Sequence, residues 1–181
     1  MAEPLLARFK LKYMGNKFAR NNALANRKGY EQQHELLKWR IVKKVSTDFT
    51  GGTSNAHGDK DGSLATYPLF TVEGDVIIKA IWGICNTSLT GSGKIEVGVS
   101  GNTAKLLAQI QDTTTLDDGD VYTDAGTEAG VELQADGGAL YFINDGADIG
   151  ELTTTADVTA GQIDYYIVWA PAEQDATVVA A

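Results

Sequence analysis

The stretch VIIKAIWGI at residues 76–84 decides the fold class. Lys79 is its one charged residue, and valine and isoleucine make up most of the rest. β-Branched residues favour extended backbone, so this apolar run after the turn residues at 73–75 predicts a strand at the centre of a sheet. The stretch KIEVGV at 94–99 follows the turn TGSG at 90–93 and alternates apolar with polar residues, which predicts a strand with one buried face.

Further strands are predicted on both sides of this pair, at 67–72, near 121–122, and at 139–143, 149–155 and 162–169. Residues 104–110 fit either a strand or a short helix, and the apolar end at 175–181 is suited to dock on the body. Turn signals recur at about ten-residue spacing, without long helical segments between strands. The sequence therefore predicts an all-β protein, with a single antiparallel β-sandwich or barrel-like domain and an extended N-terminal arm.

Three segments are predicted along the chain. Residues 1–48 form an extended basic arm, 49–66 a Gly-rich polar loop or linker, and 67–181 the β-sandwich body. Within the arm, FKLKY at 9–13 alternates like a strand, residues 31–38 suit a short helix, and 38–45 read as a strand. The arm has too few apolar residues to build a core alone, so we expect a partner chain to hold it.

Charge divides the chain into two parts. Residues 1–44 contain eleven Lys and Arg against three acids, about +8, and the remainder has four Lys against 21 acids, about −17. Such asymmetry favours binding of the arm to an acidic protein surface, including a neighbouring copy, with nucleic acid or a solvated tail as alternatives. Nucleic acid is the weaker alternative because no phosphate-binding loop or RNA-binding aromatic motif is present. The predicted partner-binding residues are Arg8, Lys10, Lys12, Lys17, Arg20, Arg27, Lys28, Lys38, Arg40, Lys43 and Lys44.

No catalytic signature accompanies these features, so we expect no enzyme activity and no cofactor. The single cysteine, Cys85, lies in an apolar run and is expected to pack as a small buried hydrophobe, while His34 and His57 fall in no catalytic motif. Residues 59–62, DKDG, faintly resemble a calcium loop, but a lysine interrupts them and the distant Glu is missing, so no metal site is predicted. The acidic stretch 113–132 reads as a solvated loop.

Four aromatic residues suit either the core or a sugar-binding face: Trp82, Trp169, Tyr165 and Tyr166. Their positions within apolar strands favour the core. No signal peptide and no long apolar span is recognisable, so we expect a protein made in a host cytoplasm without membrane insertion.

Residues 49–181 carry a resemblance. Its motifs are FTGGT at 49–53, AHGDKDG at 56–62, LATY at 64–67, LFTVEGDV at 69–76, GVSGNTA at 98–104, AGQI at 160–163 with Tyr165 and Tyr166, and TVVAA at 177–181. This region resembles the decoration (cement) proteins of tailed-phage capsids, and the basic arm lies outside the resemblance.

The resemblance implies a structural virion protein that binds the outer surface of the capsid and clamps neighbouring subunits. Its implied partners are the major capsid protein and further copies of itself in a homotrimer, with no cofactor. From the residues themselves we expect no membrane contact and regard nucleic acid as an unlikely partner. The alternatives are a head-fibre or tail part and a host-surface carbohydrate-binding module.

Overall fold

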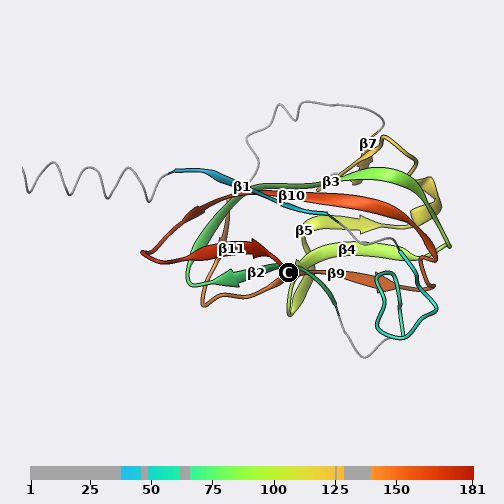
Figure 1. The fold of residues 1–181 in the computed structure, drawn as a ribbon, viewed down its shortest axis with the longest axis horizontal. Coiled ribbons are helices and arrows are strands. Elements are labelled where there is room, and N and C mark those ends of the chain that lie inside the picture. The colour runs from blue at the N-terminus through green and yellow to red at the C-terminus, as the bar shows by residue number, and fades with distance from the viewer. Residues whose placement is uncertain (1–37, 46–48, 62–65, 125, 129–139) are drawn as a thin grey trace, which may run out of the picture. The chain divides into compact units, whose positions relative to one another are not determined.

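The computed structural model describes residues 38–45, 49–61, 66–124, 126–128 and 140–181, and residues 39–181 form one compact unit. This unit is all-β with two antiparallel sheets stacked as a sandwich, which confirms the predicted fold class (Figure 1). The first sheet, sheet A, contains β1 (Arg40–Lys44), β3 (Val76–Thr90), β6 (Val121–Thr123), β7 (Gly126–Glu128), β8 (Tyr141–Ile143) and β10 (Ala160–Pro171). The second, sheet B, contains β2 (Tyr67–Glu73), β4 (Lys94–Val99), β5 (Asn102–Ile110), β9 (Ile149–Thr154) and β11 (Thr177–Ala180).

Strand order places the predicted central strand at the middle of sheet A. The order is β1-β10-β3-β6-β7, and β8 pairs with the first residues of β3 on the same side as β6. Sheet B runs β11-β2-β9-β4-β5, so the chain repeatedly crosses between the sheets. A short 3₁₀ turn at Thr113–Thr115 follows β5, and the side chain of Asp112 caps it by accepting a hydrogen bond from the Thr114 amide. The ambiguous segment at 104–110 is a strand.

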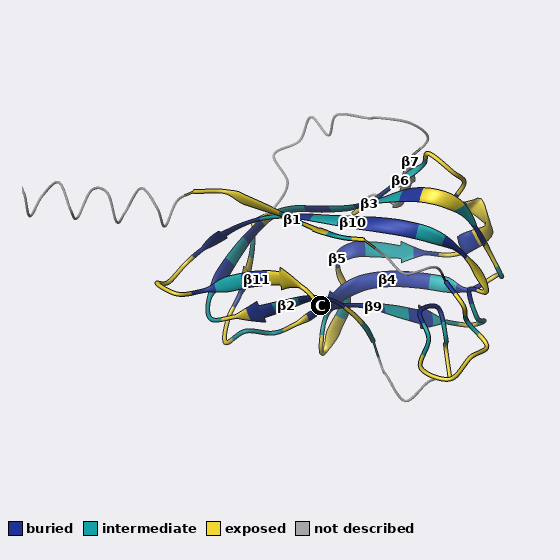
Figure 2. Cartoon of the chain, viewed as in Figure 1, coloured by how far each residue is buried: buried dark blue, intermediate teal, exposed yellow. Residues whose placement is uncertain are grey.

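The core lies between the two sheets. Ile78, Tyr165 and Ile167 project into it from sheet A, and Leu69 and Ile149 meet them from sheet B, all fully buried. Figure 2 shows this layer as the dark blue inner parts of the strands. Burying such side chains is the main favourable contribution to folding, at roughly 1.5–3 kcal/mol for each large apolar residue.

A bulge in β3 gives this strand an irregular pattern of burial. The ladder with β10 pairs Ala80 with Val168 and then Ile78 with Trp169, so one residue of β3 is skipped. An extra residue in one strand shifts the alternation of side chains by one position. Val76 and Ile78 therefore face the core before the bulge, and Ile81 and Cys85 face it afterwards.

Two parts of the chain differ from the predicted segments. Residues 40–44, assigned to the arm, form an edge strand of the body because β1 pairs along its whole length with β10. Residues 49–61, read as a linker, pack onto the body, with Phe49 and His57 buried. The Phe49 amide donates to the Gly161 carbonyl at 2.9 Å. The segments predicted at 9–13 and 31–37 lie outside the described residues.

Gly58 makes the close packing of this loop possible. It is buried with a φ of +88°, and a Cβ there would lie 2.4 Å from the Val158 carbonyl oxygen. A side chain would meet both an unfavourable backbone angle and a backbone atom. Gly101 has a similar φ of +82° but open space around it.

We expect Gly58→Ala to destabilise the protein more than Gly101→Ala. The Gly101 change costs about 1–2 kcal/mol for the left-handed backbone alone, and the Gly58 change adds about 1–3 kcal/mol for overpacking. Chemical denaturation of both variants measures the difference. Equal losses for the two variants would show that the loop at 49–61 is not packed as described.

Candidate interaction surface

The outer face of sheet A is apolar. Burial alternates along the strands, so the residues between the core positions point away from sheet B. Cross-strand pairs join them into rows, with Ile41 opposite Val168 and Phe142 opposite Ile77. The apolar members of this outer face are Ile41, Ile77, Ala80, Trp82, Ile84, Phe142, Tyr166 and Val168. Because an outer sandwich face bathed in water is normally polar, this composition makes the outer face of sheet A the candidate interaction surface of the described residues.

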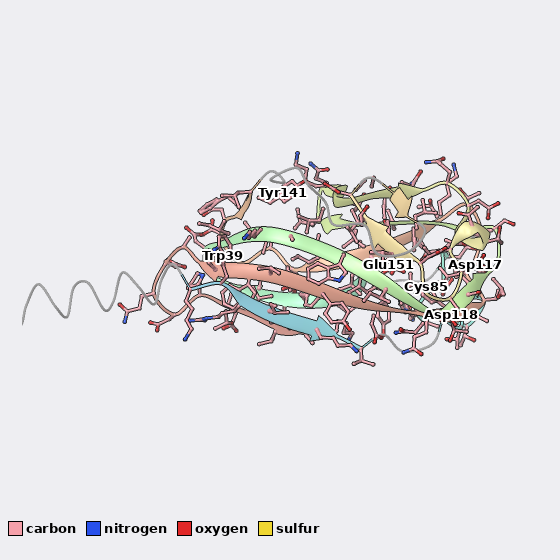
Figure 3. All side chains as sticks on the ribbon, turned by 90° about the horizontal axis from the view of Figure 1, so that it is seen from above. Trp39, Cys85, Asp117, Asp118, Tyr141 and Glu151 are labelled. Atoms are coloured by element: carbon pink, nitrogen blue, oxygen red, sulfur yellow. The ribbon has the colours of Figure 1, made fainter. Side chains whose placement is uncertain are left out.

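Two residues on opposite sides of this face are the most exposed. Ile41 on β1 is 67% exposed and Phe142 on β8 is 61% exposed. Trp39, just before β1, is 42% exposed, and the Lys79 ammonium lies 5.4 Å from its ring centroid. Figure 3 views the molecule from above and labels Trp39 near the start of β1. Large apolar side chains thus flank the half-buried centre of the face.

An aromatic ladder crosses the centre of the outer face. Trp82 and Tyr166 are cross-strand neighbours with ring centroids 5.4 Å apart and planes inclined by 6°. The Lys43 ammonium lies 5.3 Å from the Tyr166 ring centroid and 2.6 Å from the Asp164 carboxylate. The hydrogen bond with Asp164, and then that with Tyr166, raises the pKa of Lys43. The ladder holds these side chains in fixed positions.

The stacking of Trp82 on Tyr166 limits how these rings could bind a sugar. Stacking of a sugar needs a free ring face, but Tyr166 is flanked by Trp82 and by Lys43. Tyr165 and Trp169, the other two aromatic candidates, are buried in the core, as their apolar strands predict. Of the four residues, only Trp82 and Tyr166 reach the outer face, and they stack on each other there.

The predicted basic site is only partly within the described residues. Four of its members are described, Lys38, Arg40, Lys43 and Lys44; the others, Arg8, Lys10, Lys12, Lys17, Arg20, Arg27 and Lys28, lie outside. Arg40 lies over the Trp169 ring at 5.0 Å, and the Lys44 ammonium donates to the Ala181 carbonyl. The three cations of β1 thus contact other strands of the body, and their predicted role in partner binding stays a prediction. Charge counting gave no weight to Ile41 and Val42 between them, although these β-branched residues were the signal that predicted a strand there.

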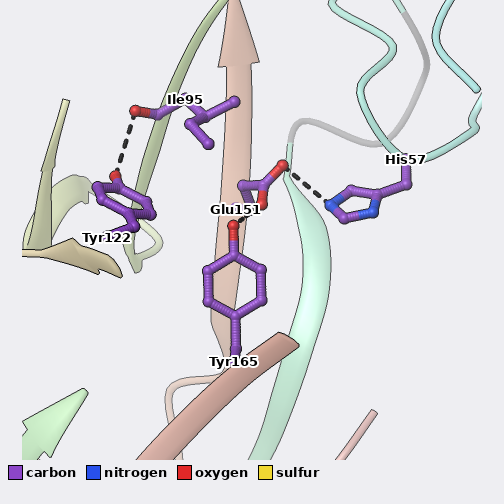
Figure 4. A network of polar contacts seen from close by, with 5 residues as sticks. All are labelled: His57, Ile95, Tyr122, Glu151 and Tyr165. Atoms are coloured by element: carbon purple, nitrogen blue, oxygen red, sulfur yellow. Dashed lines mark hydrogen bonds and ion pairs between the residues drawn. The ribbon is translucent and has the colours of Figure 1, made fainter. Parts of the chain in front are cut away.

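A buried polar network joins the loop at 49–61 to both sheets (Figure 4). The Glu151 carboxylate on β9 lies 3.0 Å from the His57 Nε2 and accepts a hydrogen bond from the Tyr165 hydroxyl of β10. The imidazole of His57 is stacked between the rings of Phe49 and Tyr67, with centroids 3.9 and 4.2 Å away. Burial raises the pKa of Tyr165, so its hydroxyl stays protonated and donates.

This buried network stabilises the fold. The side chains of His57 and Glu151 are 1% and 0% exposed, so the described residues leave a substrate no access to them. A second buried tyrosine, Tyr122, donates to the Ala108 carbonyl at 2.7 Å and thereby ties β6 to β5. Together these bonds connect the two sheets through the core, where an unpaired polar group is costly.

The remaining sequence candidates are placed as follows. Cys85 is buried, as expected, and burial raises the pKa of its thiol to about 11, so it stays protonated near neutral pH. Asp59 accepts hydrogen bonds from the backbone of Asn55 and Asp61, and Lys60 pairs with Asp61. In the described part of the chain, no group of three or more His, Cys, Asp or Glu is arranged to hold a metal ion. Nor does that part contain a helix with the length and apolar character needed to cross a bilayer.

Comparison of the chain with protein-family models, curated proteins and solved structures finds no match.

Proposed function

We propose that this chain is a structural virion protein that binds the outer surface of a tailed-phage capsid and clamps neighbouring capsid subunits. Its partners are the major capsid protein and further copies of itself in a homotrimer. The resemblance of the body to decoration proteins suggests the setting, and the apolar outer face of sheet A is the observation that carries the binding role.

The location of this face supports a clamp. Its border strand, β1, is joined directly to the basic residues 1–38, so one partner can contact the face and the N-terminal segment together. Residues 39–181 contain 21 acids and seven basic residues, and four of the seven are Arg40, Lys43, Lys44 and Lys79 on or beside β1 and the outer face. A capsid patch that is apolar and carries acidic residues therefore complements the outer face of sheet A, where Lys43 lies over Tyr166 and Lys79 over Trp39.

Binding of many copies to one capsid allows each copy to make only modest contacts. An exposed apolar side chain that anchors an interface contributes about 2–4 kcal/mol when it is fully desolvated. Copies linked to one another bind a repeating shell with an effective concentration that raises the total affinity by roughly 10²–10⁴. A small sandwich with one apolar face can thus decorate a capsid stably.

Deleting residues 1–38 is expected to leave a folded body that binds capsids more weakly than the full chain does. The body has its own core, whereas the removed segment carries eight basic residues and three acids. The measurement is co-sedimentation with phage particles stripped of the protein, and circular dichroism verifies that the shortened chain is folded. Unchanged binding would show that the segment has no role in clamping.

Antibody labelling separates the proposal from its alternatives. Antibodies against the body are expected to label the icosahedral shell of intact virions. Labelling confined to tails or fibres would identify a different virion part. Specific retention on a glycan array, abolished by Trp82→Ala, would favour the carbohydrate-binding class and overturn the proposal.

A further inference from the structure

The two borders of sheet A differ in charge. On one border, residues 39–45 around β1 contain Arg40, Lys43 and Lys44 and no acid, a net charge of +3. Toward the other border, residues 117–124 around β6 contain four aspartates and no base, a net charge of −4. Within the described residues, β1 and β7 end the main strand order of this sheet, and β8 forms a further edge beside the start of β3. We propose that copies of the chain associate head to tail through these borders, with β1 of one copy beside the β6–β7 hairpin of the next.

The β1 border is suited to accept a strand. Its ladder with β10 runs from Arg40–Trp169 to Lys44–Tyr165 without a register shift, and it contains no proline. Edge strands are commonly protected from pairing by bulges, proline or charged side chains. Here two of the charged side chains are bound within the protein itself. The Lys43 ammonium pairs with the Asp164 carboxylate, and the Lys44 ammonium donates to the Ala181 carbonyl.

The positive charge of the β1 border determines which strand can lie beside it. A second β1, or the basic residues 1–38, would place cations against cations at this border. An acidic strand is instead attracted, and within the described residues the β6–β7 hairpin, with the acidic loop that precedes it, lies on the side of sheet A opposite β1. Asp120 and Asp124 lie at the two ends of β6, and Asp117 and Asp118 precede it in the loop labelled in Figure 3.

Such an interface is heterologous, because each copy offers a basic border to one neighbour and an acidic border to another. Heterologous contacts generate rings when the rotation closes. The inference therefore deepens the self-association in the proposed function by naming the surfaces that meet. It leaves the outer face of sheet A available for a capsid.

Two matched variants test the proposal in free solution. Arg40→Glu with Val45→Glu reduces the net charge of residues 39–45 from +3 to zero, and both positions are exposed. Asp118→Lys with Asp124→Lys brings residues 117–124 from −4 to zero and keeps Asp120, whose carboxylate accepts the Asp117 amide. Thermal unfolding checks that both variants remain folded.

Sedimentation velocity then distinguishes the modes of association. The wild type is expected to form an oligomer that weakens with added salt, and each variant alone to be monomeric. An equimolar mixture of the two variants is expected to form a heterodimer, because each retains the border that the other lacks.

Two results would overturn the proposal. They are a monomeric wild type and an assembly that persists in the variant of the acidic border. If that persistent assembly dissociates on Leu140→Asp, the contact lies beside β8 instead. A monomeric wild type that still binds capsids would remove the self-association and leave the capsid role intact. A stable oligomer that fails to bind capsids would remove the capsid role and leave the self-association intact.

Discussion

Glu151→Ala is expected to lower the free energy of unfolding by about 3–5 kcal/mol, the range observed when one member of a buried pair is removed. The change leaves the His57 ring nitrogen and the Tyr165 hydroxyl without their shared acceptor in the core. It also leaves a cavity where the carboxylate stood. The loop at 49–61 would lose the contact that fixes its histidine, so its cleavage by protease should accelerate.

Glu96 provides a matched control. This glutamate, on the neighbouring β4, is 8% exposed and accepts hydrogen bonds from Thr103 and Gln109, which are themselves partly exposed. Its replacement by alanine is expected to cost about 1 kcal/mol, since water can satisfy the released partners. Urea denaturation of the two variants gives both values. A loss below that of Glu96→Ala would show that the Glu151 network does not hold the sheets together.

Ile41→Asp combined with Phe142→Asp is expected to abolish capsid binding. Each change places a charge where an apolar side chain would be desolvated by the partner, and removal of one such anchor costs about 2–4 kcal/mol. Two anchors on every copy multiply the loss across a repeating shell. Both side chains are largely exposed in the isolated protein, so its folding stability should change little.

Val179→Asp is the control for this experiment. Val179 is 52% exposed on β11 and follows the buried Val178, so its side chain points to the outer side of sheet B, away from sheet A. Co-sedimentation with stripped particles should show binding for the control and none for the double variant. Equal binding by both would exclude the outer face of sheet A as the capsid contact.

The sequence predicted the strands well because their signals are local. The run at 76–84 was correctly placed in a central strand, and alternation correctly marked β4. The same run also suggested burial on both faces, yet Trp82 and Ile84 are only half-buried. A run of apolar residues indicates that both sides avoid water, but it does not say whether the covering layer belongs to the same chain.

Contacts between residues far apart in the chain could not be predicted from the sequence. His57 was assigned to a linker because its partner Glu151 lies 94 residues away and nothing near it in sequence indicates burial. The strand at 40–44 was counted with the arm because its basic residues dominate its composition, whereas its pairing with β10 depends on the opposite end of the chain. The apolar surface was hidden for the same reason, since it is assembled from β1, β3, β8 and β10.

The most direct test of the proposed capsid role is an image reconstruction of tailed-phage particles to which this chain has been added. The proposed function predicts density for the sandwich on the outside of the icosahedral shell, with the face containing Ile41 and Phe142 turned toward the capsid protein. A shell without such density, or a bound sandwich whose outer sheet A face points into solvent, would contradict it.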